Sequence, residues 1–395
     1  MSVLAKRWRY LWKMVPNLEF NDNDKYDPET FSDNVCRFLL SHQAPLLQSL
    51  HLISNVEEPT RIDIGILVAV AFGLHVRKLV LRVYFDEEPF KFPRSLYNCE
   101  TLETLELLAY CGSILVDVPS PVCLKSLRTL HLHEVSYKDD ESVLNLLSGC
   151  INLENLVVNR CGYDIVKTFT IAVPSLQRLT LIDEIDDSVF EINAPSLKYL
   201  EIDGRYGGGR YCMIENASEL VEAKIVIDEA SYENILGSIT SVKRLSLKLS
   251  PLEITFPTGS IFYELAYLEL CTFRTEWWNL LTLMLDTSPN LQVLKLIGFK
   301  RQWENVKNKG PWGKWNKPKN VPECLLLHLE TFVWTCYEAR VEDEIEVAKY
   351  ILRNARRLKK ATFSKIEIKP SKRVEMVEEL KSVVRASNSC QLVFK

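Results

Sequence analysis

The chain has 395 residues, of which 47% are apolar and 25% charged. This ordinary globular composition excludes a disordered, collagen-like or coiled-coil chain. The 48 Lys and Arg residues are outnumbered by 52 Asp and Glu residues, giving a formal net charge of -4. We therefore expect no general attraction to nucleic acid or to an anionic membrane, and nucleic acid is not an expected partner.

The N-terminal region lacks the features of a secretion signal or a membrane anchor. Four basic residues interrupt the apolar character of its first fifteen positions: Lys6, Arg7, Arg9 and Lys13. The longest apolar run, at 64–74, has eleven residues, too few to cross a bilayer. The 11 cysteines include no C-x-x-C pair and are expected to be reduced thiols. These features predict a cytoplasmic or nuclear protein without membrane contact.

A six-residue pattern, L-x-x-L-x-L with apolar substitutes, recurs along the chain. Its thirteen copies begin at Leu47, Val76, Leu102, Leu127, Leu153, Leu176, Leu197, Leu220, Val242, Leu265, Leu291, Leu329 and Leu358. The twelve intervals span 311 residues, so the mean period is near 26. This lies within the roughly 20 to 29 residues of leucine-rich repeats. Only the 38-residue interval after Leu291 is discordant.

These copies predict an α/β fold. The last two apolar positions of each copy are two apart, so they share one face of a strand, and stacked copies bury one another's apolar faces. We predict a leucine-rich-repeat solenoid at 45–300, with a parallel concave sheet and irregular helices and turns on the convex side. Helices are expected at 64–74, 142–148, 232–236 and 276–285. The short units near Pro174 and Pro195 lack room for a helix and should return by turns.

Polar residues between the buried strand positions are expected to face solvent on the concave side. The candidate binding residues are Arg128, His131, Glu154, Arg178, Lys198, Glu201, Arg244 and Lys295. Their mixed charge favours a protein partner over a phosphate polymer. His131, His133 and Glu134 could indicate a metal site, in which the two His side chains share one face of a strand, but no third and fourth ligands cluster beside these two, so no metal is predicted.

The discordant interval contains a basic, Trp-containing loop, predicted at 301–320. Residues 300–319 carry seven bases and one acid, interleaved with Trp303, Trp312 and Trp315. Such a loop could bind an anionic peptide, a phosphorylated ligand or nucleic acid. The candidate anion-binding residues are Lys307, Lys309, Trp312 and Lys314. An ordinary surface insertion is the alternative explanation.

Two regions carry a resemblance to a known family. Residues 1–20 resemble the C-terminal portion of an F-box, through Leu4, Lys6, Arg7, Trp8, Arg9, Leu11 and Trp12. Residues 313–395 resemble an FBD region, through Trp315, Pro318, Val321, Pro322, Glu323, Cys324, Leu325, Trp334 and Tyr337. With the repeats between them, the chain resembles plant F-box proteins with leucine-rich repeats and an FBD region.

The resemblance implies a substrate-recognition subunit of a Skp-cullin-F-box ubiquitin ligase. Its concave face would bind a target protein, while the Skp adaptor and cullin are further possible partners. Relatives of this type carry more helical residues upstream, so residues 1–20 are expected to be an F-box remnant that covers the first repeat. The alternatives are an interaction scaffold or decoy without a ubiquitin role and, more distantly, a receptor for a small anionic ligand.

The C-terminal region is predicted to cap the repeats. Amphipathic helices are expected at 342–357 and 373–385, each followed by a strand, at 361–363 and 391–394. They would cover the exposed apolar end that a repeat protein must close. The sequence contains no recognisable catalytic triad or nucleotide-binding motif, so we expect neither enzymatic activity nor a cofactor.

Overall fold

The chain forms two compact units in the computed structural model, Met1–Leu197 with Gly207–Ala217, and Lys198–Tyr206 with Ser218–Lys395. The structure describes residues 11–22, 28–54, 64–83, 90–91, 94–109, 114–118, 121–160, 162, 164–185, 188–204, 211–227, 235–249, 259–271, 277–298, 315, 317–335, 342–364 and 370–395. Within these ranges no helix is both long and apolar enough to span a membrane.

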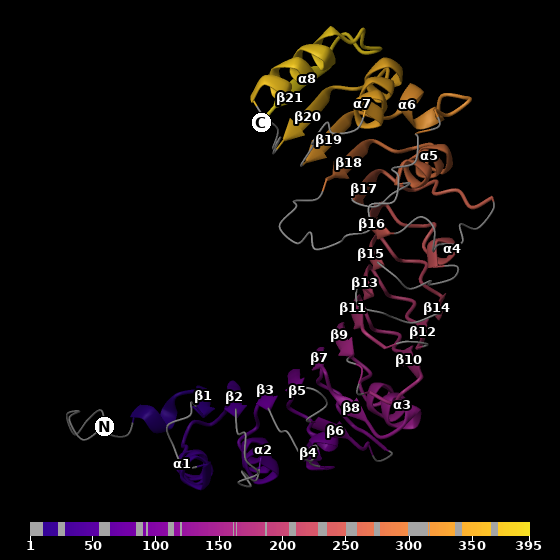
Figure 1. The fold of residues 1–395 in the computed structure, drawn as a ribbon. Coiled ribbons are helices and arrows are strands. Elements are labelled where there is room, and N and C mark those ends of the chain that lie inside the picture. Colours follow the sequence, from indigo (N-terminus) through magenta and orange to yellow (C-terminus); the bar gives the residue numbers. More distant parts are fainter. Residues whose placement is uncertain are drawn as a thin grey trace. The chain divides into compact units, whose positions relative to one another are not determined.

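The main sheet of the first unit consists of parallel strands in chain order (Figure 1). They are β1 (Asn17–Asp22), β2 (Ser49–Ser54), β3 (Lys78–Val83), β5 (Thr104–Ala109), β7 (Thr129–His133), β9 (Asn155–Arg160) and β11 (Arg178–Asp183). Each predicted copy from Leu47 to Leu176 leads into one of these strands, and equivalent leucines stand in register, as Leu50 with Leu79 and Leu79 with Leu105.

Helices and short strands in the first unit return the chain between successive main-sheet strands. The helices are α1 (Pro28–Leu40), α2 (Ile64–Gly73), η3 (Arg94–Asn98) and α3 (Asp140–Ser148). The short strands form two parallel sheets, β4 (Phe90–Lys91), β6 (Ile114–Val116) and β8 (Ser136–Tyr137), and β10 (Thr168–Ala172), β12 (Val189–Asn193) and β14 (Tyr211–Glu215). The units near Pro174 and Pro195 therefore return by paired strands, where the sequence predicted turns. Phe169 and Phe190 stand in register there and are buried. The returning segments are too short for helices, and strand pairing provides hydrogen-bond partners for their backbone N–H and C=O groups.

The second unit continues the same arrangement of strands and helices. Its main-sheet strands are β13 (Tyr199–Gly204), β15 (Glu222–Ile227), β16 (Arg244–Leu249), β17 (Tyr267–Cys271), β18 (Val293–Ile297), β19 (Thr331–Thr335), β20 (Lys360–Ser364) and β21 (Gln391–Phe394). The helices α4 (Ile235–Ser238), α5 (Trp277–Thr287), α6 (Glu323–Leu327), α7 (Glu342–Asn354) and α8 (Pro370–Ser382) lie on one side of this sheet (Figure 1). The predicted α/β repeat fold with a parallel sheet is confirmed.

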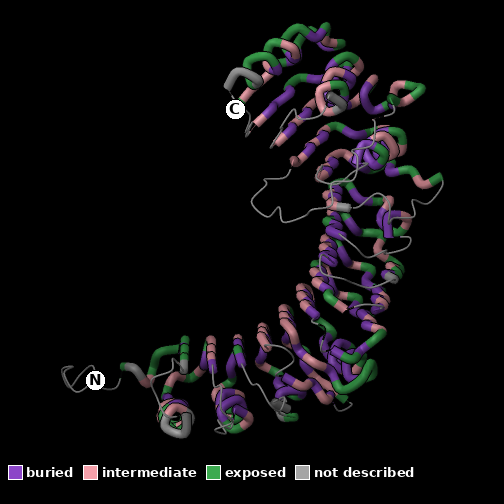
Figure 2. Tube along the Cα trace, viewed as in Figure 1, coloured by how far each residue is buried: buried purple, intermediate pink, exposed green. Residues whose placement is uncertain are grey.

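Along many main-sheet strands, buried and partly exposed residues alternate, as the colours in Figure 2 show. In β7, Leu130 and Leu132 are buried, whereas Thr129, His131 and His133 are partly exposed. A period of two places the partly exposed residues on the side of the sheet opposite the buried leucines. We call this side, in each unit, the open face.

Candidate protein-binding surface

The open face carries five of the eight residues predicted to bind a partner. His131, Glu201 and Lys295 occupy the middle of their strands, and Arg178 and Arg244 begin theirs. The other three, Arg128, Glu154 and Lys198, directly precede strands and lie along the N-terminal edge of the sheet. There the Glu154 backbone N–H donates to the Arg128 carbonyl at 2.9 Å. The predicted residues thus form two groups, one on the face and one at its edge.

Charged residues in the first unit pair with the neighbouring repeat. Arg128 forms an ion pair with Glu154. Lys78 Nζ lies 2.7 Å from Glu106 Oε1, and Glu106 stands in register beside His131. Burial lowers the pKa of His131. The negative charge of Glu106 raises this pKa in part, and the positive charge of Lys78 lowers it further. His131 is therefore neutral at physiological pH and presents a hydrogen-bonding ring to solvent.

The two predicted histidines of β7 share one face without forming a metal site. His133 Nδ1 lies 3.5 Å from Asn159 Nδ2. Burial also lowers the pKa of His133, with a further contribution from His131. Across the part of the chain that the structure describes, no three His, Cys, Asp or Glu residues are placed to hold a metal ion.

The open face of the second unit is crossed by hydrogen-bonded acid–base groups. Glu201 accepts hydrogen bonds from Lys224 Nζ at 2.6 Å and Tyr199 Oη at 2.9 Å. Two strands beyond β15, Glu269 accepts from Lys295 Nζ at 2.7 Å, Ser246 Oγ at 3.0 Å and Tyr267 Oη at 3.1 Å. The positive charge of Lys295 is therefore largely neutralised by Glu269 before any partner arrives.

Arg244 is held differently from these lysines. Its guanidinium carbon lies 4.1 Å from the centroid of the Tyr267 ring, and its Nε is 3.6 Å from Glu222 Oε2. Its side chain remains 50% exposed. Stacking fixes the plane of the guanidinium while leaving most of its N–H donors open to a ligand.

Sequence reasoning missed the partners that organise this face. Tyr199, Glu222, Lys224, Tyr267 and Glu269 were not among the predicted residues. All occupy the variable positions of the repeat pattern, as the predicted residues do, so the pattern alone could have marked them as open-face residues. What it lacked was the pairing between strands, because the paired residues are more than twenty positions apart in the sequence.

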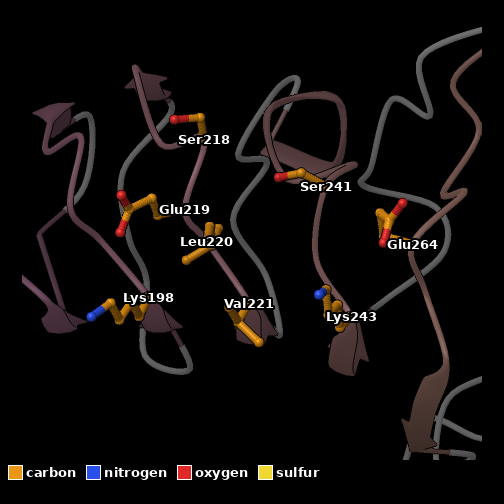
Figure 3. A pocket seen from close by; sticks show the side chains of 8 residues that line it. All are labelled: Lys198, Ser218, Glu219, Leu220, Val221, Ser241, Lys243 and Glu264. Carbon is orange, nitrogen blue, oxygen red and sulfur yellow. The ribbon is translucent and has the colours of Figure 1, made fainter.

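A hollow of about 440 Å³ lies at the edge of the second unit's sheet. Figure 3 shows Lys198, Val221 and Lys243 at successive strand starts, with Ser218, Glu219, Ser241 and Glu264 on the segments before them. Two lysines are balanced by two carboxylates, so the hollow has no excess positive charge for an anionic ligand.

Comparison with known proteins places this architecture in a family. The chain is 65% identical over 400 residues to the Arabidopsis thaliana F-box/FBD/LRR-repeat protein At3g26920, covering 100% of this chain and 90% of that protein. It is 56% identical over 400 residues to the putative F-box/FBD/LRR-repeat protein At4g13965 of the same plant, covering 100% and 91%. The chain belongs to the F-box/FBD/LRR-repeat protein family. The suspected resemblance is therefore confirmed.

Two family models match separate parts of the chain. The model described as FBD matches residues 317–363. The model described as "FBD-associated F-box protein At5g56370, LRR repeats" matches residues 68–220. The LRR model covers mostly repeats of the first unit and extends into the strand β13 of the second unit. The FBD model lies wholly in the second unit, where it covers α6, β19, α7 and most of β20.

Residues of the FBD motif mainly build the core of the second unit. Cys324 and Leu325 of α6 are buried, and Cys324 Sγ donates to the Leu285 carbonyl at 3.4 Å. Trp334 of β19 is buried against Trp277, with ring centroids 5.7 Å apart. Pro322 is buried at the residue before α6, Pro318 and Val321 are half-buried, and Glu323 is exposed. Tyr337 lies outside the described residues.

Trp315 also packs within the FBD region. Its ring meets that of Tyr350 with centroids 5.3 Å apart, and Lys317 Nζ lies 5.3 Å from the Tyr350 ring centroid. Trp315 and Lys317, near the end of the predicted basic loop, therefore pack against α7. Lys307, Lys309, Trp312 and Lys314 lie outside the described residues, so the anion-binding role remains a prediction.

The predicted F-box remnant is only partly described. Leu4, Lys6, Arg7, Trp8 and Arg9 lie outside the described residues. Leu11, 50% exposed, and Trp12 belong to the short helix η2 (Leu11–Met14), which leads into β1. Backbone N–H groups of Gln43 and Gln48 donate to the carbonyls of Lys13 and Pro16 at 2.8 and 2.7 Å. Backbone hydrogen bonds thus join residues 11–16 to the start of the first repeat.

Proposed function

We propose that this protein is a non-enzymatic interaction module whose open face binds a target protein. The observation that carries this proposal is the composition of the open face, where Arg, His, Tyr and carboxylate side chains recur on adjacent parallel strands. Repeat proteins use such extended surfaces for binding. Tyr and Arg also contribute strongly to interface energies. Membership of the F-box/FBD/LRR-repeat family supports an interaction role rather than catalysis.

The proposal extends to a ubiquitin ligase, in which the Skp adaptor and cullin would be the other partners. This part of the proposal is supported by the family name, which includes the F-box, and by the backbone hydrogen bonds that join residues 11–16 to the first repeat. The alternative is an interaction scaffold or decoy that binds the same target without delivering it. Both functions use the open face and differ only at the N-terminal segment.

Target binding is tested by charge reversal at three exposed arginines. In the triple variant R128E/R178E/R244E, we expect at least tenfold less target captured from plant extract, with unchanged circular dichroism. Solvent-facing substitutions usually change the free energy of unfolding by less than about 0.5 kcal/mol each. The proposal fails if the folded variant captures every partner of the parent chain equally well.

The ligase role requires a separate experiment. Purified chain is mixed with the purified plant Skp adaptor and analysed by size-exclusion chromatography, with R128E/R178E/R244E as a matched control that leaves the N-terminal segment intact. Co-elution of both with the adaptor supports the ligase role. Elution of the adaptor alone, while target capture persists, supports the scaffold.

We place the protein in the cytoplasm or nucleus. The support is chemical, because Cys99, Cys150, Cys212, Cys324 and Cys390 are buried free thiols. Reducing compartments preserve such thiols, whereas oxidising compartments favour disulfides. A fluorescent fusion found inside the secretory pathway would contradict this assignment.

A further inference from the structure

We propose that one row of residues across the second unit binds a short extended peptide segment with acidic side chains on both sides of a central apolar one. This inference rests on the proposed function and names the chemistry that the open face recognises. The row comprises Arg244, Tyr267, Val293, Thr331 and Lys360, and we call it the cross-strand row.

The cross-strand row is continuous because its members stand in direct register. Arg244 on β16 pairs with Tyr267 on β17, and Tyr267 with Val293 on β18. Val293 pairs with Thr331 on β19, and Thr331 with Lys360 on β20. All five lie at the first open-face position of their strands. They therefore line one path that crosses five strands at right angles to the strand direction.

The chemistry along this path is uncharged in the middle and positive at both ends. Tyr267, Val293 and Thr331 are each half-buried, whereas Arg244 and Lys360 are exposed. An uncharged centre with a charged rim is the usual anatomy of a protein-binding patch. Arg244, stacked on Tyr267 at 4.1 Å, has the fixed geometry of an interaction hot spot.

The neighbouring row does not cancel the charge at these ends. Its principal charges, Glu269 and Lys295, are joined at 2.7 Å and neutralise each other. Glu222 on β15 stands in register beside Arg244 and comes nearest to it at Nε, 3.6 Å away, while the Arg244 side chain remains 50% exposed. Within the described ranges, Lys360 has no ion-pair partner, whereas the adjacent Lys359 pairs with Glu330 at 2.7 Å. An occupant with acidic ends therefore complements the row.

The spacing of the row favours a polyproline II segment of seven residues. Neighbouring strands are about 4.8 Å apart, so Val293 is about 10 Å from each end of the row along the path. In polyproline II geometry, every third residue faces the same way, about 9.3 Å apart. Carboxylates at the first and seventh peptide positions would then reach Arg244 and Lys360, and an apolar residue at the fourth would cover Val293.

The test uses the full chain and fluorescein-labelled synthetic peptides in fluorescence anisotropy. The probe is Glu-Pro-Pro-Leu-Pro-Pro-Glu, and the matched controls are Lys-Pro-Pro-Leu-Pro-Pro-Lys and Glu-Pro-Pro-Ser-Pro-Pro-Glu. We expect the probe to bind at least tenfold more tightly than either control. The R244E/K360E variant should reverse the charge preference and bind the Lys-flanked peptide better, while R244K/K360R retains the original order.

Two outcomes would overturn the inference. One is equal affinity for the three peptides, and the other is an unchanged preference in R244E/K360E with native circular dichroism. Target capture separates this failure from that of the proposed function. If R178E on β11 reduces capture while R244E/K360E does not, target binding stands and the cross-strand row is not its site. If neither variant reduces capture, the proposed use of the open face fails as well.

Discussion

Arg160 Nε lies 2.8 Å from Asp164 Oδ2, and neither side chain is exposed to solvent. Arg160 Nη1 is also 3.9 Å from Asp183 Oδ1, and the guanidinium carbon is 5.4 Å and 5.6 Å from the ring centroids of Phe169 and Phe190. The buried guanidinium of Arg160 therefore balances the charge of two buried carboxylates and also lies against two aromatic rings. This cluster lies in the first unit beside the short strands β10 and β12, where buried charge replaces purely apolar packing.

Replacing Arg160 with Met should destabilise the protein strongly. Removing one partner leaves two carboxylates buried without a counter-charge, which typically costs about 3–5 kcal/mol. Urea denaturation at pH 7 measures this loss in the free energy of unfolding. The matched control is R244M, at an exposed site, where we expect a change within about 0.5 kcal/mol. Similar losses in the two variants would contradict the structural role of the cluster.

The loss in R160M should become smaller as the pH falls. Burial raises the pKa of both Asp164 and Asp183, and the Arg160 charge opposes this rise. Without Arg160 the two pKa values rise further. A carboxyl with a raised folded-state pKa is unfavourable above that pKa, and protonation relieves the penalty as the pH falls through it. The stability difference between parent and variant is therefore expected to be smaller at pH 5 than at pH 7.

Glu269 should show the opposite pH behaviour. Burial raises its pKa, but the hydrogen bond and charge of Lys295 and the hydrogen bonds of Ser246 and Tyr267 outweigh this and lower it. Its stabilising contribution is thus present above the unfolded-state pKa and is lost as the pH falls through the folded-state value. We expect E269Q to lose about 1 kcal/mol at neutral pH. The loss should vanish below the folded pKa, as urea denaturation from pH 7 to pH 3 would measure.

Gly149 is required for close packing rather than for backbone conformation. It caps α3 with a φ of -78°, which any residue can adopt. A Cβ there would overlap Val122 Cγ1 and lie 2.8 Å from the Val122 carbonyl oxygen. We expect G149A to cost about 1–3 kcal/mol in thermal or urea unfolding. Gly73 provides the control, because nothing lies within 4 Å of its added Cβ and G73A should be neutral or slightly stabilising.

Cysteine reactivity should divide the thiols by burial. Burial raises the pKa of Cys150, Cys212 and Cys324 to about 12, so almost no reactive thiolate exists at pH 8. Among the cysteines that the structure describes, native protein treated with an aromatic disulfide reagent should be modified first at the half-exposed Cys36, Cys123 and Cys271. Peptide mass spectrometry identifies the modified sites. Modification of Cys150 as fast as Cys123 in folded protein would contradict the buried placement.

The repeat pattern predicted more of the fold than its individual copies seemed to justify. The copy at Leu220 reads LVEAKI, yet it leads into β15, and the copies at Leu329 and Leu358 lead into β19 and β20. In each copy the same positions of the pattern are buried, because hydrogen bonding to the neighbouring strand keeps equivalent residues in register. The helices expected at 64–74, 142–148, 276–285 and 342–357 were also found, as α2, α3, α5 and α7.

The sequence by itself determined the main-sheet strands from β2 onward and their order, because apolar spacing acts locally and recurs with nearly constant period. It did not predict β1 or the short return strands. Only the tertiary structure decided which charges are neutralised. Lys295 meets Glu269, 26 positions away, and Arg244 stacks on Tyr267, 23 positions away, because each pair occupies neighbouring strands in register. A list of polar positions could not distinguish a closed ion pair from an available cation, since that difference depends on contacts between residues far apart in the chain.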